Sequence, residues 1–548
     1  MNQTTAIEIL RNNQIISAQF TTPEPGLDQY TIPGCNQPGQ TRITLQLPIA
    51  DAAGFWYGSL QPGARMHLDW NIHFCCGAQY QYPVFALMQR NSCCNCAVTL
   101  SNLWDDTTFT AVLDQEHECY KLQIVIAHAA AATKPFQLRL DRRHLPLDQT
   151  LSDWRTSLEL PAHTFPAAAW DPVYCTWYAR HGAVDAAWLE PTAERAVNMG
   201  FKTLIVDDGW CYDEYCRVNP DTIADWYHTI GDYQVSQVKF PHFAEHVRRV
   251  QAMGMNYMLW VAPHLIGFDS KFYQQHPDAV IEPRVEGYRR LNVHDPAMRN
   301  LITQRMAALM REGNLDGLKI DFIDIVRPAP DAPNALATLD FAREPSNAVR
   351  SIRPDALIEF RQSYTNCAML SLGTQFRAGD APFDYQKNFG RVAEIRLALG
   401  DNIPVHADPA FWSKTDPMEC VARHMIAMLG GVPMLSMDLL TLSSVEEKVI
   451  RNWMNFYSQH QALLNHGHWS ILLNNQNIAA MTVEDDQQKI VLLNDANYAE
   501  KLIRSTDKKL FMANLSEQTA DVAAGHTTDG CGAIVNSRGI PVGGLGEF

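Results

Sequence analysis

The spacing of apolar residues divides the chain into three parts. From residue 1 to about 160, short apolar runs of strand length are separated by clusters of Gly, Pro and Asn. From about 170 to 460, short β-branched and aromatic runs alternate with longer stretches whose apolar residues recur every three or four positions. Strand-like runs then return and end in a Gly-rich tail. The pattern therefore predicts β structure at both ends and repeated strand–helix units between them.

The middle part contains eight runs of strand length with helical stretches between them. These runs are VYCTWY (173–178), TLIVDDGW (203–210), YMLWVAP (257–263), LKIDFIDI (318–325), LIEFRQSY (357–364), QFRAGD (375–380), IPVHADP (403–409) and VPMLSMD (432–438). Eight such units in one segment predict a (β/α)8 TIM barrel. We therefore expect a multidomain chain with an N-terminal β-sandwich over 1–160, a catalytic barrel over 161–465 and a small C-terminal β-sandwich over 466–548.

Composition narrows the class of protein and its partners. Hydrophobic residues make up 46% of the chain and charged residues 19%, enough for several buried cores and unlike a disordered chain. The net charge is −16 and no basic run exists, which argues against nucleic acid or an anionic membrane as partner. No apolar stretch reaches the ~18 residues of a membrane span, and the first residues do not resemble a signal peptide. With 13 cysteines, many in apolar runs, we expect a reduced, cytoplasmic protein.

Five cysteines cluster in the first part of the chain. They are Cys75, Cys76, Cys93, Cys94 and Cys96. Only Cys93 and Cys96 have the Cys-x-x-Cys spacing, whereas a zinc site of this kind prefers two such pairs. Half-buried strand cysteines are therefore the preferred interpretation, and we predict no metal and no cofactor.

Charged residues stand at the ends of most of the predicted barrel strands, where such barrels place their active sites. They are Asp207 and Asp208, Lys319 and Asp321, Glu359 and Arg361, Arg377 and Asp380, His406 and Asp408, and Asp438. Burying so many ionisable groups is costly unless they pair or react. We favour an active site over ion pairs that only fill the barrel, because pairing alone does not require so many carboxylates at one rim.

Lys319 and Asp321 lie two residues apart on one strand and therefore point to the same face. The ammonium group favours an ionised carboxylate, as a nucleophile or an oxocarbenium stabiliser requires. Asp380 on another strand is the candidate acid, for which we expect a raised pKa. Aromatic side chains that suit the apolar face of a sugar stand near the ends of the first three strands: Trp177, Tyr178, Trp210 and Trp260.

Two motifs resemble those of a known family. LIVDDGW (204–210) and LKIDF (318–322), together with Trp177 and Trp260, resemble the melibiase-type α-galactosidases of glycoside hydrolase family 36 and, more distantly, family 27. The resemblance is detailed over about 170–440 and concerns only the layout outside it. It implies a metal-free retaining exo-α-glycosidase, with α-galactosidase as the default specificity.

The resemblance also implies roles for individual residues. Asp321 would form a covalent glycosyl intermediate, and Asp380 would protonate the leaving oxygen and then activate water. The substrate contacts would be Asp207 and Asp208 with the 4- and 6-hydroxyls, Lys319 and Arg377 with further hydroxyls, and Trp177 and Trp260 as walls of the pocket. Tyr178 and Trp210 complete the predicted sugar-binding set.

Two departures from the family pattern leave parts of this assignment open. Arg377 precedes Asp380 by three residues instead of four, so Asp384 is the alternate acid. The stretch RQSYTN (361–366) replaces a Cys-Ser-Gly-Gly type, so recognition of the 2-position, and with it an α-N-acetylgalactosaminidase, stays open. Three further functions stay open: a transglycosylase, a Schiff-base lyase that uses Lys319, and a non-catalytic carbohydrate-binding protein. We expect a carbohydrate as partner and leave open a homo-oligomer.

Overall fold

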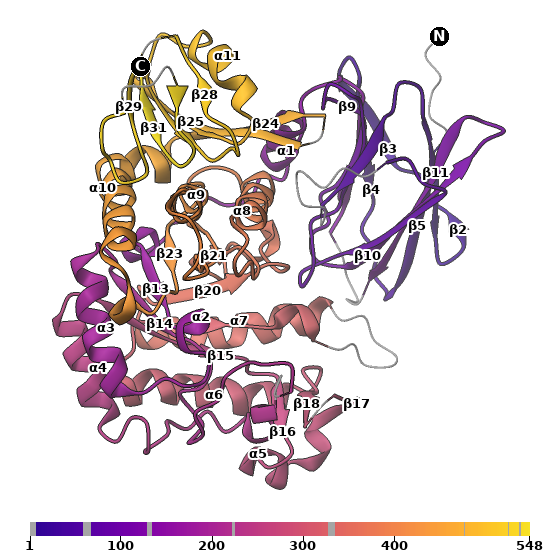
Figure 1. The fold of residues 1–548 in the computed structure, drawn as a ribbon. Helices are drawn as coiled ribbons and strands as arrows, with labels where there is room; N and C mark the ends of the chain where they lie inside the picture. The colour runs from indigo at the N-terminus through magenta and orange to yellow at the C-terminus, as the bar shows by residue number, and fades with distance from the viewer. Residues whose placement is uncertain are drawn as a thin grey trace.

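A computed structural model describes residues 7–58, 67–128, 134–221, 225–285, 287–326, 335–475, 477–523, 525–535 and 539–548. The first six residues, where the sequence predicts no export signal, lie outside this range. The chain forms two N-terminal β-sheets, a central barrel with helices around it, and a C-terminal sheet above the barrel (Figure 1). The predicted three-part architecture is therefore confirmed.

The N-terminal part consists of two antiparallel six-stranded sheets. One has the order β2 (Gln14–Ile15), β1 (Ile7–Arg11), β5 (Gly39–Pro48), β11 (Cys119–His128), β10 (Asp106–Asp114) and β7 (Asn71–Cys76). The other has the order β3 (Gln19–Glu24), β4 (Leu27–Ile32), β12 (Phe136–Asp141), β9 (Cys94–Leu100), β8 (Val84–Met88) and β6 (Gly54–Tyr57). Buried residues alternate with exposed or half-buried ones along β5, because one face of its sheet packs on the apolar core between the sheets.

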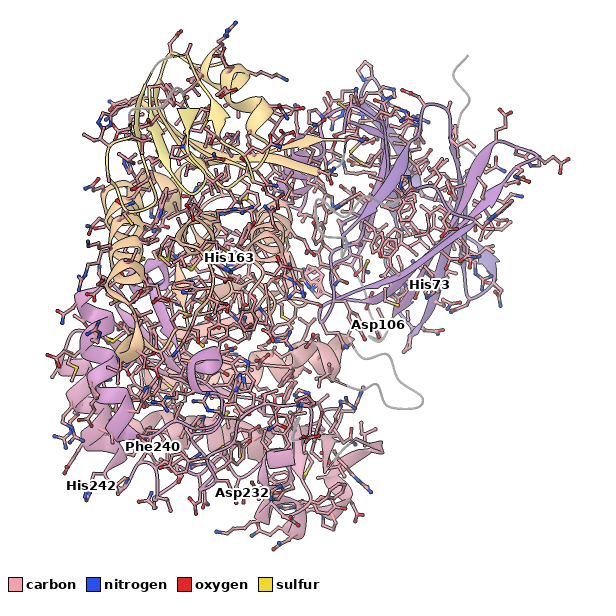
Figure 2. The ribbon with its side chains drawn as sticks, in the orientation of Figure 1. His73, Asp106, His163, Asp232, Phe240 and His242 are labelled. Carbon is pink, nitrogen blue, oxygen red and sulfur yellow. The ribbon has the colours of Figure 1, made fainter. Side chains whose placement is uncertain are left out.

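The barrel contains all eight predicted strands, each parallel to its neighbours. They are β13 (Val173–Cys175), β14 (Thr203–Val206), β15 (Asn256–Val261), β19 (Gly317–Ile320), β20 (Leu357–Arg361), β21 (Gln375–Arg377), β22 (Val405–His406) and β23 (Met434–Leu435). Bridges from His406 to Val432 and from Ala410 to Leu435 link the last two strands and nearly close the barrel. Side chains fill its interior and the space between the N-terminal sheets (Figure 2).

Helices follow the barrel strands as the sequence predicts. They are α2 (Trp177–Arg180), α3 (Ala186–Asn198), α4 (Phe243–Ala252), α6 (Pro296–Gly313), α7 (Ala335–Ile352), α8 (Tyr385–Leu399), α9 (Met418–Met428) and α10 (Ser444–His466), and α1 (Leu147–Ser157) precedes the barrel. Asp185 caps α3 by accepting a hydrogen bond from the Trp188 amide, and the helix gives way at Gly200, whose φ of +95° suits glycine.

The first barrel strand is shorter than the sequence predicts. We expected strand structure over 173–178, but β13 ends at Cys175, and Trp177 and Tyr178 begin helix α2. The Ser436 hydroxyl accepts hydrogen bonds from the amides of Tyr178 and Ala179, which fixes this turn against the last strand of the barrel. Both aromatic residues therefore sit on a helix at the rim, above the end of the strand.

Two further sheets complete the fold. A small sheet that the sequence did not predict is inserted after β15. It has the order β16 (Leu265–Gly267), β18 (Tyr288–Leu291) and β17 (Val280–Val285), and helix α5 (Lys271–Gln275) belongs to the same insertion. The main C-terminal sheet has the order β24 (His468–Asn474), β25 (Asn477–Glu484), β26 (Gln488–Leu493), β27 (Lys509–Asn514), β31 (Leu545–Glu547) and β29 (His526–Thr528). Helix α11 (Ala499–Ile503) and the short pair β28 (Ala520–Asp521) and β30 (Gly539–Ile540) lie beside it. Within the described residues, no helix combines the length and the apolar character needed to cross a membrane.

Candidate active site

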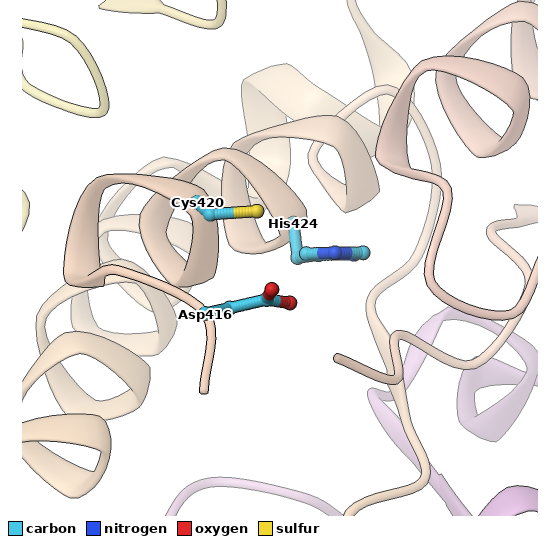
Figure 3. A group of neighbouring side chains, drawn as sticks. All are labelled: Asp416, Cys420 and His424. Carbon is cyan, nitrogen blue, oxygen red and sulfur yellow. The ribbon is translucent and has the colours of Figure 1, made fainter. Parts of the chain in front are cut away.

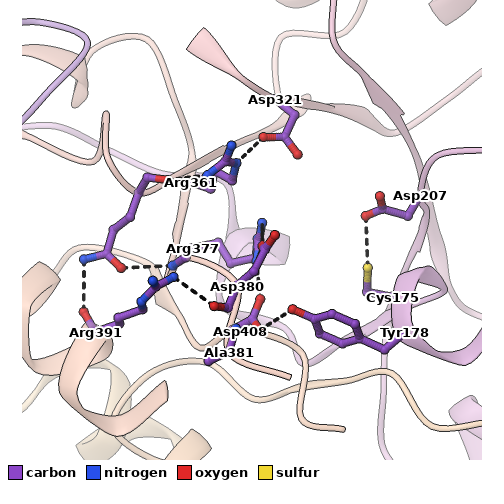
Figure 4. A network of polar contacts seen from close by, with 12 residues as sticks. Cys175, Tyr178, Asp207, Asp321, Arg361, Arg377, Asp380, Ala381, Arg391 and Asp408 are labelled. Carbon is purple, nitrogen blue, oxygen red and sulfur yellow. Dashed lines mark hydrogen bonds and ion pairs between the residues drawn. The ribbon is translucent and has the colours of Figure 1, made fainter. Parts of the chain in front are cut away.

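Most of the charged residues predicted at the strand ends gather in one network at the C-terminal rim of the barrel (Figure 4). His406 and Asp438 lie outside it: His406 bonds the Ala169 carbonyl, and Asp438 pairs with Arg180. Asp207 and Asp208 follow β14, Lys319 lies on β19 with Asp321 just beyond it, and Arg377 ends β21 with Asp380 three residues later. The structure therefore brings together polar groups that lie far apart in the sequence. Arg361 at the end of β20 and Asp408 after β22, to which the sequence assigned no role, also belong to the network.

Asp321 is buried and held from several sides. Its side chain is 7% exposed. One carboxylate oxygen accepts a hydrogen bond of 2.9 Å from the Trp260 indole, and the other accepts one of 2.7 Å from the Phe322 amide and pairs with the Arg361 guanidinium. The backbone turns at Phe322, whose φ of +61° is uncommon for a bulky residue. These contacts fix the carboxylate in one orientation.

The charges around Asp321 keep it ionised. Burial alone would raise the pKa of Asp321, but Arg361, Lys319 and Arg377 together outweigh burial and lower the pKa well below its usual value. Lys319 lies 3.9 Å from Asp321 and donates a 2.6 Å hydrogen bond to Asp207. Asp321 is therefore a negatively charged group at any pH near neutrality.

The same contacts argue against the Schiff-base lyase. Burial and Arg377 lower the pKa of Lys319, but Asp207, Cys175 and Asp321 raise it more, so the net pKa lies above its usual value. A Schiff-base lysine needs a neutral amine to attack a carbonyl carbon. Lys319 is instead a permanent cation between two carboxylates.

Asp207 and Asp208 are both buried, at 3% and 1% exposure. Asp207 accepts hydrogen bonds from Lys319, from the Cys175 thiol at 3.2 Å and from the Asp208 amide at 2.9 Å. The Asp207 carboxylate thus already accepts hydrogen bonds from other groups of the protein, and its contact with a substrate hydroxyl remains a prediction.

Arg377 contacts three carboxylates of the site, those of Asp408, Asp380 and Glu359. It is 2% exposed, pairs closely with Asp408, and lies 3.2 Å from Asp380 and 3.4 Å from Glu359. The Asp380 side chain is 56% exposed. Arg377 therefore holds one oxygen of the Asp380 carboxylate and leaves the side chain accessible to a ligand.

The raised pKa that we predicted for Asp380 is wrong for the unliganded protein. Burial would raise the pKa of Asp380, but Arg377 and Arg361 outweigh it, so the pKa is lowered. Asp408 has a raised pKa instead. It is fully buried, accepts hydrogen bonds from Tyr178 at 2.8 Å and from the Ala381 amide at 2.7 Å, and burial and Asp380 raise its pKa to about 7.

The predicted aromatic residues lie at different depths. Trp210 is fully buried and donates a hydrogen bond of 2.8 Å to the backbone of Trp260, which is itself 2% exposed. Tyr178 is also buried, with its hydroxyl on Asp408. Trp177 is half-buried and packs edge-on against His181, with ring centroids 4.9 Å apart. Of the four, Trp177 has the most accessible ring for contact with a sugar.

Asp384, the alternate acid, caps helix α8. It is exposed, and its carboxylate accepts a hydrogen bond of 2.8 Å from the Lys387 amide. This contact gives Asp384 a structural role outside the network, whereas Asp380 lies within it.

Gln79 of the N-terminal part contacts the loop that follows Asp321. Its amide nitrogen donates to the carbonyls of Asp324 and Val326 at 3.2 and 3.3 Å, and its oxygen accepts from the Thr338 hydroxyl at 3.0 Å. Asn366, in the loop after β20, donates to three carbonyls of the segment 77–80 at 2.9 to 3.2 Å. No sequence pattern indicates this contact, because Gln79 belongs to no motif.

We expect Gln79→Ala to lower both thermal stability and turnover. The substitution removes the partners of two carbonyls and of a buried hydroxyl, at about 1–3 kcal/mol for each group left unsatisfied. It also frees the loop beside Asp321, so kcat should fall by about tenfold with little change in KM. Gln89→Ala, on a half-buried glutamine that bonds Asp51, is the control and should change neither. Equal kcat values for wild type and Gln79→Ala would contradict a positioning role.

Glu359 lies under the site and is fully buried. Burial raises the pKa of Glu359 to about 7 in spite of Lys319 and Arg377. An unfolded chain loses this proton near pH 4.5, whereas the folded chain keeps it to about pH 7, so stability falls as the pH rises between these values. The loss is at most about 3 kcal/mol.

We therefore expect Glu359→Gln to gain stability relative to wild type as the pH rises from about 5 to about 8, because glutamine cannot ionise. The measurement is the midpoint of thermal unfolding of both proteins at several pH values. Glu194→Gln on the exposed side of α3 is the control and should leave the pH dependence unchanged. A constant difference between Glu359→Gln and wild type at all pH values would contradict the raised pKa.

The five clustered cysteines of the N-terminal part do not form a metal site in the described residues. Cys75 and Cys76 lie at the end of β7, whereas Cys94 and Cys96 lie on β9 in the other sheet. The described part of the chain contains one group of three metal-binding side chains, and it lies elsewhere. Cys75, Cys76, Cys94 and Cys96 lie on strands as expected, but Cys76, Cys94 and Cys96 are fully buried and Cys75 is exposed, so none of the four is half-buried.

Comparison with known proteins shows which family the chain resembles. Residues 166–335 match the family model of Melibiase. Alpha-galactosidase 1 of Pediococcus pentosaceus is 25% identical over 60% of this chain and 47% of its own length. The bifunctional alpha-galactosidase/sucrose kinase AgaSK of Mediterraneibacter gnavus is 23% identical over 67% of this chain and 40% of its own. The chain thus spans less than half the length of these relatives.

The fold is shared with solved structures of the same class. A variant of the GH36 alpha-galactosidase AgaA from Geobacillus stearothermophilus, in complex with raffinose, superimposes with a TM-score of 0.67 at 13% identity, covering 99% of this chain and 89% of that one. This chain therefore shares the fold of that protein along its N-terminal β-sheets, its barrel and its C-terminal β part. The Melibiase model matches residues 166–335 of the barrel, and the predicted resemblance to melibiase-type α-galactosidases is confirmed.

Proposed function

We propose that this protein is a retaining exo-α-galactosidase, which removes terminal α-galactosyl residues through a covalent intermediate on Asp321. The observation that carries the proposal is the state of Asp321: a buried carboxylate, kept ionised by three cations and fixed by Trp260 and Phe322, beside the more exposed Asp380. A glycosidase of this kind needs one permanently charged carboxylate and one that exchanges a proton with the leaving group.

In the first step, Asp321 attacks the anomeric carbon and the bond to the leaving oxygen breaks. Asp380 donates its proton to that oxygen. In the unliganded protein the pKa of Asp380 is lowered by Arg377 and Arg361, so Asp380 must gain its proton as substrate covers it and excludes water. Because Asp380 is the exposed member of the network, a bound sugar changes its environment more than that of Asp321.

In the second step, Asp380 acts as a base. Ionised after the first step, it accepts a proton from water, which attacks the anomeric carbon and breaks the ester bond to Asp321. Two displacements at one carbon give net retention of configuration. Arg377 and Lys319 stay charged throughout and limit the free-energy cost of moving negative charge between the carboxylates.

The same network is proposed to recognise the substrate. Asp207, Asp208, Lys319 and Arg377 are proposed to bind ring hydroxyls, and Trp177 is proposed to contact the apolar face of the sugar, with Trp260, Trp210 and Tyr178 behind them. A cavity of about 680 Å³ opens beside Tyr178, lined by Phe411, Trp412 and Glu446, and offers room for the remainder of a longer saccharide. Relatives crystallised with raffinose and stachyose support saccharides of this type as substrates.

The first test is hydrolysis of nitrophenyl glycosides by the purified full chain. The panel holds the α-galactoside, the α-N-acetylgalactosaminide, the α-glucoside and the β-galactoside. We expect turnover of the α-galactoside, with the α-anomer of galactose as the first product in NMR spectra. The β-anomer as first product would overturn the retaining mechanism, and no turnover of either galacto-configured α-substrate would overturn the proposed specificity. Transfer products with added sugar acceptors would identify a transglycosylase.

A further inference from the structure

Asp416, Cys420 and His424 converge on one point at the start of helix α9, outside the network of the proposed active site (Figure 3). One carboxylate oxygen, the thiol sulfur and one ring nitrogen all lie within 4.8 Å of one another. The three residues are spaced by four, so that they recur on one face of a helix, and Asp416 stands just before the first turn. The described part of the chain contains no second group of this kind.

His424 provides an independent sign that this group binds a ligand. Its side chain is 2% exposed, and Nε2 has no hydrogen-bond partner among the described residues. The rings of Tyr385 and Trp412, with centroids 5.3 and 5.9 Å away, surround it. A buried imidazole nitrogen without a partner is costly, so an ion bound through Nε2 would relieve an existing penalty.

The other two side chains are more accessible and are partly fixed. One oxygen of Asp416 accepts a hydrogen bond of 2.9 Å from the Ser413 amide, and the thiol of Cys420 is free and half-buried. Arg423, a nearby cation, points away toward the C-terminal sheet, where it donates to the Leu515 carbonyl at 3.0 Å and stacks on Tyr385. The point of convergence is therefore bordered by donor atoms suited to a cation.

We propose that Asp416, Cys420 and His424 bind a Zn²⁺ ion. A nitrogen, a thiolate and a carboxylate together are ligands that zinc accepts and that magnesium or calcium do not prefer. Tetrahedral bonds of about 2.0–2.3 Å require donor atoms roughly 3.2–3.7 Å apart, so the half-buried Asp416 and Cys420 side chains would have to rotate toward the ion. Three protein ligands leave the fourth position to water.

Metal binding changes the protonation of Cys420. Its thiol gives up its proton to solvent when the metal–sulfur bond forms, so Zn²⁺ binding should weaken as the pH falls.

A zinc ion here would connect the 413–416 turn to α9. The preceding residue, Trp412, lines the cavity beside Tyr178 and donates a hydrogen bond of 2.9 Å to Glu446 at the start of α10. The ion would therefore stabilise one wall of that cavity, and no step of the proposed reaction passes through it.

The experiment uses the full chain after treatment with a chelator and desalting. We expect titration calorimetry to show one Zn²⁺ bound per chain, Co²⁺ to give a thiolate charge-transfer absorption band, and Zn²⁺ to raise the Tm. Cys420→Ser should remove the band and weaken Zn²⁺ binding by more than the about 10–100-fold typical for loss of an outer-shell partner. Cys75→Ser, which removes an exposed thiol on β7, is the control and should keep both.

Two further variants keep the test independent of any one side chain. Asp416→Asn changes a half-buried residue, and His424→Gln removes the buried ring; circular dichroism checks that each is folded. Both should weaken Zn²⁺ binding. If the wild type binds no Zn²⁺, or if Cys420→Ser and Asp416→Asn bind it as tightly as wild type does, the proposal is overturned. These readouts do not depend on glycosidase activity.

Discussion

Asp321→Ala should lower kcat/KM for the nitrophenyl α-galactoside by at least about 10³-fold, because the variant lacks the group that forms the covalent intermediate. The loss should appear in kcat, since the hydroxyl-binding residues remain. The pKa of Asp321 is lowered by the surrounding cations, so the wild-type nucleophile is ionised across the accessible pH range and contributes no acid limb near neutral pH. Steady-state kinetics of the two proteins measures both effects.

A matched control lies at the other end of the same strand, since Asp316 and Asp321 flank β19. Asp316 precedes β19 at the opposite end of the barrel, where it accepts a hydrogen bond of 2.8 Å from the Tyr257 amide and pairs with Arg353. Residues at that end serve stability. Asp316→Asn should therefore lower the Tm and leave kcat nearly unchanged. Near wild-type turnover in Asp321→Ala, with the fold intact, would remove Asp321 from the mechanism.

The reaction of azide with Asp321→Ala gives a sharper result. In the alanine variant, a small anion can enter the space that the carboxylate occupied and attack the anomeric carbon directly. One displacement inverts the configuration, so an α-galactoside should yield the β-galactosyl azide. NMR identifies this product. Its formation would show that Asp321 faces the side of the sugar from which the nucleophile attacks the anomeric carbon.

The sequence predicted the barrel well because its signals are local. Each strand is a short apolar run, and each helix has its own period, so all eight strands could be placed before any contact was known. The main error concerns 173–178, where an apolar and aromatic run is compatible with strand or helix. The side-chain hydroxyl of Ser436, more than 250 residues away, holds the chain as a helix at Tyr178, and no local pattern contains that contact.

The sequence predicted which residues form the site but not the pKa of Asp380. The spacing of Lys319 and Asp321 correctly placed an ammonium group beside a carboxylate. The pKa of Asp380, however, depends on Arg361, which comes from a neighbouring strand, and on Arg377, which is held in place by Asp408. These distances arise only when the barrel closes, and for the same reason Gln79 could not be found from sequence.

Asp380→Ala should affect substrates according to their leaving groups. A nitrophenolate leaves without much help from an acid, so the first step on the nitrophenyl galactoside should slow only modestly, whereas hydrolysis of raffinose should fall by about 10²–10⁴-fold. The pH dependence should change as well. In wild type, kcat/KM should decline as the pH rises, because Asp380 with its lowered pKa is protonated in an ever smaller fraction of the protein. In Asp380→Ala this decline should disappear.

Azide again distinguishes the roles of the two carboxylates. In Asp380→Ala the glycosyl–Asp321 ester still forms, and azide, which needs no base, should attack it and restore turnover of the nitrophenyl substrate. Two displacements then occur, so the product should be the α-galactosyl azide, opposite in configuration to that from Asp321→Ala. Asp384→Ala, which removes only the cap of α8, should need no azide. Rescue of Asp384→Ala and not of Asp380→Ala would transfer the acid–base role to Asp384, because azide restores turnover only where the general base has been removed.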